Sequence, residues 1–223
     1  MNDIINNFEE FEEPQEFSTL KTDNLIFEIW VKPRLVFAYL FKYDPSKYVQ
    51  ILLVISALTT AFERNLSRNI GWHDSYNTSY FIGVCLGGGL MVYVIYYVSA
   101  WFLHFFGKAF LNGQANPKDF RTVIAWANIP SIASAIFSFI ILVIYGSKAL
   151  SDSYLPISGI ERIVFISFAI IQVTLAIWAL IITIIGVKEI QKFSTVKALG
   201  NILLPFIILI VVVLIIFLIG DLF

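Results

Sequence analysis

The chain has 223 residues, of which 58% are hydrophobic and only 14% are charged, and its mean hydropathy is +0.81. Because about a quarter of the residues in a soluble domain are charged, this composition predicts an integral membrane protein. The net charge of −1 and the lack of a basic, aromatic-rich patch argue against nucleic-acid binding. The single cysteine, Cys85, excludes an intrachain disulfide and predicts a small residue of an apolar core.

The first 23 residues are polar and acidic. Five glutamates alternate there with phenylalanines: Glu9, Glu10, Glu12, Glu13 and Glu16 lie among Phe8, Phe11 and Phe17. We expect a disordered, solvated cytoplasmic tail over residues 1–23. A short linear motif that binds a basic partner surface is the alternative. No secretory signal pattern is visible in this stretch, so the first membrane span is expected to act as the insertion signal.

Residues 24–47 are apolar but interrupted by charges and by Pro33. Charged side chains are costly in the bilayer core, which argues against a membrane span here, and the proline separates two short apolar pieces. We predict an N-terminal interfacial amphipathic helix, with Trp30, Lys32 and Arg34 at the level of the lipid headgroups.

Five apolar segments follow in residues 48–223. We place the spans at 48–62, 80–106, 120–146, 163–186 and 199–222. The fold class is therefore predicted to be an all-α membrane protein, a bundle of five transmembrane helices. The last span is almost wholly aliphatic, so we expect it at the periphery of the bundle, facing lipid.

The distribution of Lys and Arg predicts the topology. Only Arg64, Arg68, Lys148 and Arg162 fall on one side of the five spans, and the other eleven basic residues fall on the opposite side. The positive-inside rule then places the N-terminus in the cytoplasm and the C-terminus outside. The bilayer would be the inner membrane if the source is prokaryotic.

The first span ends in an adjacent charged pair, Glu63 and Arg64. Neighbouring residues point about 100° apart on a helix, so the two side chains need not face each other. We favour the interpretation that the pair sits at the membrane interface. A buried functional dyad is the alternative.

The second span changes character along its length. Gly83 and Gly87 have the small-xxx-small spacing that lets two helices approach closely, and two more glycines follow. Tyr93 and Tyr97 then continue one face with aromatic side chains. His104 lies near the far end and is expected to be an interfacial residue rather than a ligand.

The third span is the most unusual, because Asn128 and Pro130 stand where aliphatic residues are expected. Small residues follow on one helical face at spacings of four and three: Ala127, Ser131, Ser134 and Ser138. Two interpretations of the proline are open. Either residues 120–129 lie at the interface and the span begins near Pro130, or one continuous span is kinked there.

Catalytic signatures are not found in the sequence. It contains no HExxH, GxSxG, P-loop or GxGxxG pattern. Its two histidines, His73 and His104, are predicted on opposite sides of the membrane and so cannot share a metal. We therefore predict no catalytic residue, no metal and no cofactor, and a protein that is not an enzyme.

Three stretches carry a family resemblance: WVKPRLVF at 30–37, AWANIP at 125–130 and GVKEIQKFSTVKALGNILLP at 186–205. With the five spans and the acidic tail, they resemble the Yip family of Ypt/Rab-interacting membrane proteins, in its prokaryotic branch. The resemblance covers roughly residues 24–223 and implies a five-helix membrane domain. Eukaryotic relatives act in vesicle trafficking and bind Rab-type GTPases from the cytoplasmic side. The family supplies no catalytic residue that matches a position here.

Two functional hypotheses follow. The first is a non-enzymatic membrane scaffold or adaptor that binds lipid and partner proteins through residues 24–43 and 187–197 on the cytoplasmic face. Its small-residue faces can also pair two copies of the chain. The second is a small transporter or channel component, with a polar path lined by Asn128, Gln172, Tyr93 and Tyr97. Neither hypothesis involves nucleic acid.

Overall fold

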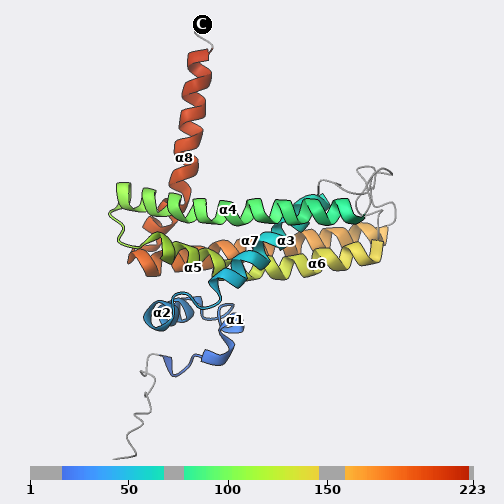
Figure 1. The fold of residues 1–223 in the computed structure, drawn as a ribbon, viewed down its shortest axis with the longest axis horizontal. Coiled ribbons are helices and arrows are strands. Elements are labelled where there is room, and N and C mark those ends of the chain that lie inside the picture. The colour runs from blue at the N-terminus through green and yellow to red at the C-terminus, as the bar shows by residue number, and fades with distance from the viewer. Residues whose placement is uncertain (1–16, 68–77, 146–158, 221–223) are drawn as a thin grey trace, which may run out of the picture.

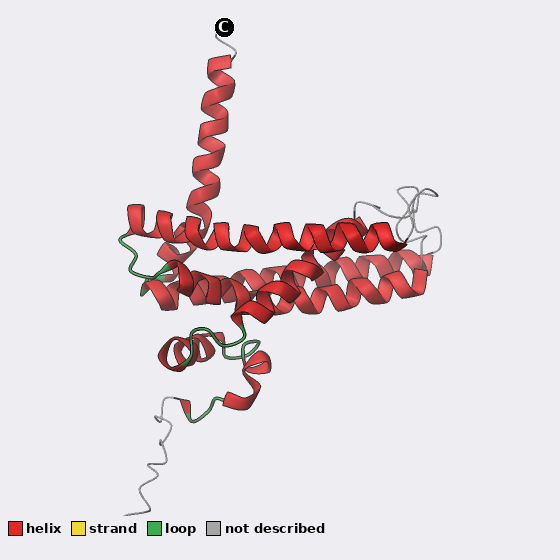
Figure 2. Cartoon of the chain, in the orientation of Figure 1, coloured by secondary structure: helices red, strands yellow, loops and turns green. Residues whose placement is uncertain are grey.

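The computed structural model describes residues 17–67, 78–145 and 159–220, and in these ranges the secondary structure is helical throughout, without strands (Figure 2). The first 16 residues of the expected tail and His73 lie outside the described residues. The helices, in chain order, are the 3-10 turn Thr22–Asn24, α1 Leu25–Glu28, α2 Pro33–Tyr43, α3 Val49–Ser67, α4 Thr78–Leu111, α5 Pro117–Ala127, α6 Ile129–Tyr145, α7 Gly159–Gln191 and α8 Thr195–Gly220.

Among the described residues, five helical segments are long and apolar enough to cross a membrane, as the sequence predicts. They are Val49–Leu66, Ser79–Leu111, Pro117–Ile144, Gly159–Gln191 and Thr195–Phe217. The third comprises α5 and α6 together. In Figure 1, α3, α4, α6 and α7 lie alongside one another as a bundle, and α8 leaves that bundle at a steep angle.

The N-terminal segment is folded against one end of the bundle. On α2, Pro33, Val36, Phe37 and Leu40 are buried, a spacing of three and four that gives the helix one apolar face. That face packs on α7, where a Cβ added to Gly186 would lie 3.0 Å from the Phe37 ring. The amphipathic pattern of α2 thus serves a protein contact. Its position at the headgroups stays a prediction.

The folded region begins earlier than the tail prediction allows. Phe17 and Leu20 fall within the stretch expected to be disordered, yet both are buried. The Phe17 ring packs edge-on against Tyr39 of α2, with centroids 5.6 Å apart. The Lys32 ammonium group also donates a hydrogen bond to the carbonyl of Thr19. From Phe17 onward, then, the chain belongs to the N-terminal fold.

The third span is divided at Asn128. α5 starts at a capping box formed by Asn116 and Asp119 and ends at Ala127. The Asn128 N–H still donates to the carbonyl of Ile124, and its carbonyl accepts from the N–H of Ile132. Helical backbone hydrogen bonds therefore continue across the junction between α5 and α6. Pro130 is the second residue of α6, where its missing N–H costs nothing. This agrees with the expectation of a helix beginning near Pro130. The placement of α5 relative to the membrane interface is not thereby tested.

The glycines of α4 pack at a different point from the pair singled out in the sequence. A Cβ at Gly89 would lie 2.8 Å from Leu58 Cδ2, and one at Gly88 would lie 3.3 Å from Ala61 Cβ. A Cβ added at Gly83 or Gly87 would meet no atom of another helix within 4 Å among the described residues. The close approach between α3 and α4 therefore depends on Gly88 and Gly89.

α8 has few contacts within the chain. Ala198 and Asn201 near its start are buried, whereas the described side chains from Leu209 to Phe217 are exposed. Its aliphatic composition suits contact with lipid on most sides, in agreement with the peripheral position expected from the sequence.

Candidate functional site

A polar cavity of about 550 Å³ lies between α3, α6 and α7. Its polar wall consists of Thr60, Glu63, Arg64, Ser131, Ser134, Ser138 and Gln172. Its apolar wall consists of Leu66, Ile141, Phe165, Phe168, Ala169 and Ala176. A cavity of this size with converging polar groups has the general form of a small-molecule site.

Glu63 is the centre of the polar wall. Ser134 Oγ donates to Glu63 Oε1 at 3.0 Å, and Ser138 Oγ donates to the same oxygen at 3.1 Å. Gln172 Nε2 donates in turn to Ser138 Oγ at 2.9 Å. Ser134 and Ser138 are buried. Three helices are thereby joined by one chain of hydrogen bonds that ends on a carboxylate.

The Glu63 side chain is half-buried, and its carboxylate contacts Ser138 of α6. Its position at the membrane interface, the favoured sequence interpretation, stays a prediction. α3 continues for another turn beyond Glu63, to Ser67, which carries the side chain inward from the helix end. The spacing of Ser131, Ser134 and Ser138 on α6 is the feature of the sequence that indicates this cavity, although we interpreted it as a face for helix packing.

Asn128 and Pro130 do not line this cavity. Pro130 is buried, and the Asn128 Nδ2 atom is buried without a hydrogen-bond partner. Asn128 therefore lies at the junction of α5 and α6, separate from Gln172. The polar path expected at Asn128 stays a prediction.

Tyr93 and Tyr97 form a second polar cluster, at the other end of α3. Both hydroxyls donate to Gln50 Oε1, at 2.7 and 3.0 Å. The Arg121 guanidinium lies 4.7 Å from the centroid of the Tyr97 ring, a cation–π distance. This cluster ties α3, α4 and α5 together and is distinct from the Glu63 cavity.

The remaining chemically notable side chains have structural partners. His104 Nδ1 lies 2.8 Å from the carbonyl oxygen of Ala115, and Cys85 Sγ lies 3.6 Å from Asn65 Nδ2. Within the described ranges, no group of three His, Cys, Asp or Glu residues is placed to hold a metal. Nothing in these contacts supplies a nucleophile with its base.

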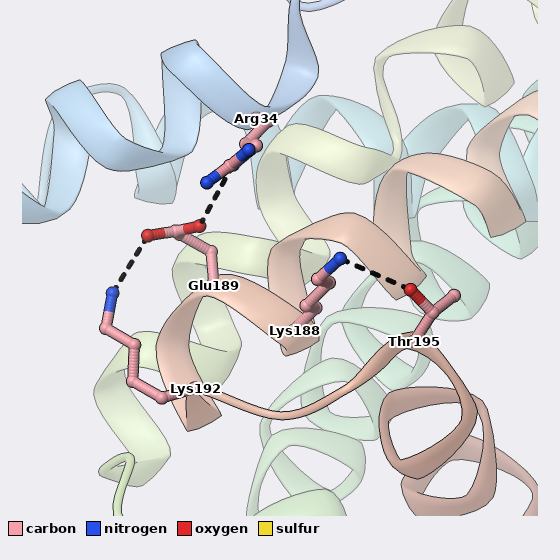
Figure 3. Close-up of polar contacts among 5 residues, drawn as sticks. All are labelled: Arg34, Lys188, Glu189, Lys192 and Thr195. Atoms are coloured by element: carbon pink, nitrogen blue, oxygen red, sulfur yellow. Dashed lines mark hydrogen bonds and ion pairs between the residues drawn. The ribbon is translucent and has the colours of Figure 1, made fainter. Parts of the chain in front are cut away.

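A charged surface is formed where α2 meets the end of α7. We call residues 24–43 and 187–197 the platform. Figure 3 shows Arg34 reaching from α2 toward Glu189 on α7, with Lys192 on the other side of that carboxylate. The distances are 3.9 Å from Arg34 Nε and 2.8 Å from Lys192 Nζ. A pocket of about 420 Å³ beside it is lined by residues that include Phe41, Lys42 and Lys192.

Local structure at the end of α7 exposes these charges. Lys192 has a positive φ of 53°, the left-handed conformation that often ends a helix. The N–H of Phe193 then donates to the carbonyl of Lys188, and Lys188 Nζ donates to Thr195 Oγ1 at 3.3 Å. The turn into α8 is therefore tight, and it holds its lysines beside α2.

The fold and these sites define a multi-pass helical membrane protein with five spans and a folded N-terminal segment. A family model for the Yip1 domain matches residues 27–217. The chain belongs to the Yip1 domain family, which agrees with the resemblance noted in the sequence. No curated protein and no solved structure matches the chain.

Proposed function

We propose that this protein is a non-enzymatic membrane scaffold that binds partner proteins through the platform. The supporting observation is that residues 24–43 and 187–197, far apart in the sequence, form one charged surface joined at Glu189. A surface held by a buried helix face is preorganised, which lowers the entropic cost of binding.

Rigidity of the platform supports this role. Trp126 of α5 is fully buried, and its Nε1 donates to the carbonyl of Lys47 at 3.1 Å. Thr122 Oγ1 donates to the carbonyl of Pro45 at 2.6 Å. The linker between α2 and α3 is thereby fixed to the bundle. Under the positive-inside topology this face is cytoplasmic, where the trafficking-type role of eukaryotic relatives would also place it.

Site-specific cross-linking tests the proposal. Lys42 and Lys192 are replaced in turn by a photo-reactive amino acid in the full chain, expressed in its native host membranes. We expect the same protein adduct at both positions, reduced by the charge reversal Glu189→Lys. Val212, an exposed residue of α8, is the matched control and should yield lipid adducts only. The absence of a protein adduct at both platform positions would contradict the scaffold role.

A second candidate function, a small transporter or channel component, is favoured by the Glu63 cavity alone. Of the residues first expected to line a polar path, only Gln172 belongs to it. Flux of small organic cations into proteoliposomes, compared between the native chain and Gln172→Leu, distinguishes this candidate. Equal leakage from protein-free vesicles and proteoliposomes would exclude it.

A further inference from the structure

The hydrogen bonds around Glu63 run in one direction. The Gln172 amide, the Ser138 hydroxyl and the Ser134 hydroxyl are all donors, and the chain ends on Glu63 Oε1. Each hydroxyl has a single proton, so neither serine retains one for a ligand. Among the described residues, two acceptor atoms of this hydrogen-bond chain have no recorded partner: Glu63 Oε2 and Gln172 Oε1. The side of the cavity around Glu63 is therefore suited to receive hydrogen bonds, although Arg64 and Ser131, which also line the cavity, carry donor groups.

The charge on that wall points to the same kind of ligand. A carboxylate among membrane helices is costly unless a partner compensates it. Among the described residues, the recorded hydrogen bonds to Glu63 come from two neutral hydroxyls, which orient the carboxylate. A cationic donor group satisfies both the charge and the vacant acceptors.

The size and walls of the cavity exclude a bare ion as a fitting occupant. About 550 Å³ is many times the volume of a metal ion, and it falls within the range of roughly 300–1,000 Å³ typical of organic ligands. Phe165, Phe168 and Ile141 provide apolar surface in the lining of the same cavity. The Phe168 ring is fixed by Phe137 of α6, with centroids 6.1 Å apart. The occupant should thus combine a cationic head with an apolar body.

We propose that this cavity binds a primary ammonium group carried on an apolar body, with Glu63 as counter-ion and Gln172 as second acceptor. Such a group is found in the headgroup of an aminophospholipid and in a free lipophilic amine. The inference goes beyond the scaffold role and rests on the cavity alone.

Binding to the full-length protein in detergent tests the ligand chemistry. Decylamine, decyltrimethylammonium and decanol share an apolar chain, but only decylamine offers a charged N–H donor. We expect decylamine to bind at least about tenfold more tightly than either analogue, since charge-assisted hydrogen bonds distinguish it from both. Equal binding of the three would overturn the proposal, because only the apolar chain would then be recognised.

Two variants test the location. Glu63→Gln keeps the shape but removes the charge, and should weaken decylamine binding by at least about tenfold. The control Glu189→Gln removes a carboxylate on the platform and should leave binding unchanged. Should Glu63→Gln fail to fold, Ala169→Leu decides the matter, because it fills the cavity and leaves Glu63 in place. Undiminished binding in the folded variant would overturn the assignment.

Native mass spectrometry separates the two sources. The protein is reconstituted with equal amounts of phosphatidylethanolamine and phosphatidylcholine. Selective retention of the first, lost in Glu63→Gln, supports a membrane lipid as the natural ligand. Decylamine binding without lipid selectivity supports a free amine. If neither decylamine nor phosphatidylethanolamine binds, the proposal is wrong, whatever the cross-linking of the platform shows.

Discussion

The two ends of the helical bundle are built differently. At one end, α2, α5 and the last turns of α7 enclose an apolar core in which Val36, Phe37, Phe120, Val123 and Trp126 are fully buried. At the other end, α3, α6 and the first half of α7 enclose the polar cavity around Glu63. The core of the first end is closely packed with apolar side chains, whereas the second end leaves room beside a carboxylate.

This contrast separates a stabilising region from a region suited to binding. Close packing provides favourable dispersion interactions and removes apolar surface from solvent. The residues at the first end should therefore contribute most to the free energy of unfolding. The side chains around a cavity make fewer packing contacts, and the hydrogen bonds between them offset only part of the stability lost in this way. The variants below are ordered by expected effect, and each tests which end carries stability.

Trp126→Ala should have the largest effect. It removes a fully buried ring and the hydrogen bond to the Lys47 carbonyl, and comparable truncations cost about 3–5 kcal/mol. Unfolding in a sodium dodecyl sulfate titration measures this loss. The control Trp101→Ala removes a ring that is 53% exposed and should change stability by about 0.5 kcal/mol or less. Equal losses would mean that the packed end is not the stabilising region.

Gly186→Ala tests the same end by adding one methyl group. The new Cβ would lie 2.6 Å from Val123 Cγ1 and 3.0 Å from the Phe37 ring, and overpacking typically costs about 1–3 kcal/mol. Thermal unfolding in detergent provides the measurement. Gly87→Ala has no atom within 4 Å of its new Cβ and should be neutral or stabilising, since alanine favours helix. A stabilised Gly186→Ala protein would contradict the close approach of α2, α5 and α7.

Ser138→Ala moves the test to the polar end. It removes the hydroxyl that links Gln172 to Glu63, and hydrogen bonds between membrane helices average about 0.6 kcal/mol. The same unfolding titration should detect this small loss. Ser131→Ala is the matched control, because Ser131 lines the cavity without a recorded hydrogen bond. A loss of several kcal/mol would show that the cavity end is as stabilising as the packed end.

Arg34→Ala should have the smallest effect on stability. The Arg34 side chain is 80% exposed and its Nε lies 3.9 Å from Glu189, and exposed ion pairs contribute about 0–1 kcal/mol. Melting temperatures at low and high salt should differ little between the variant and the native chain. A drop of many degrees that disappears in high salt would instead make this ion pair a structural element of the platform.

The sequence predicted the fold well because hydropathy and the residues that begin and end helices are local signals. Five apolar segments appear where five candidate spans are found, and Pro130 falls in the first turn of α6. The apolar residues within 24–43 also predicted an N-terminal helix. The sequence could not show that the buried face of α2 packs on α7, because an apolar helix face suits lipid and protein equally well.

The candidate site was less predictable because it depends on contacts between distant segments. Glu63, Ser138 and Gln172 come from three helices, and no short spacing in the sequence joins them. Next to Arg64 and near the end of an apolar run, Glu63 resembled an interfacial residue. Among the α4 glycines, likewise, only the facing side chains of Leu58 and Ala61 reveal that Gly88 and Gly89 make the contact.

The composition of α3 also bears on how the protein is made. It is the least hydropathic of the five candidate spans and the most enclosed by the rest of the chain, and Glu63 finds its serine partners on a helix synthesised later. A segment that leaves the ribosome first but depends on later helices cannot reach its final environment as it emerges. α3 can therefore complete its contacts only after α6 has been made, so the order of synthesis differs from the order of assembly.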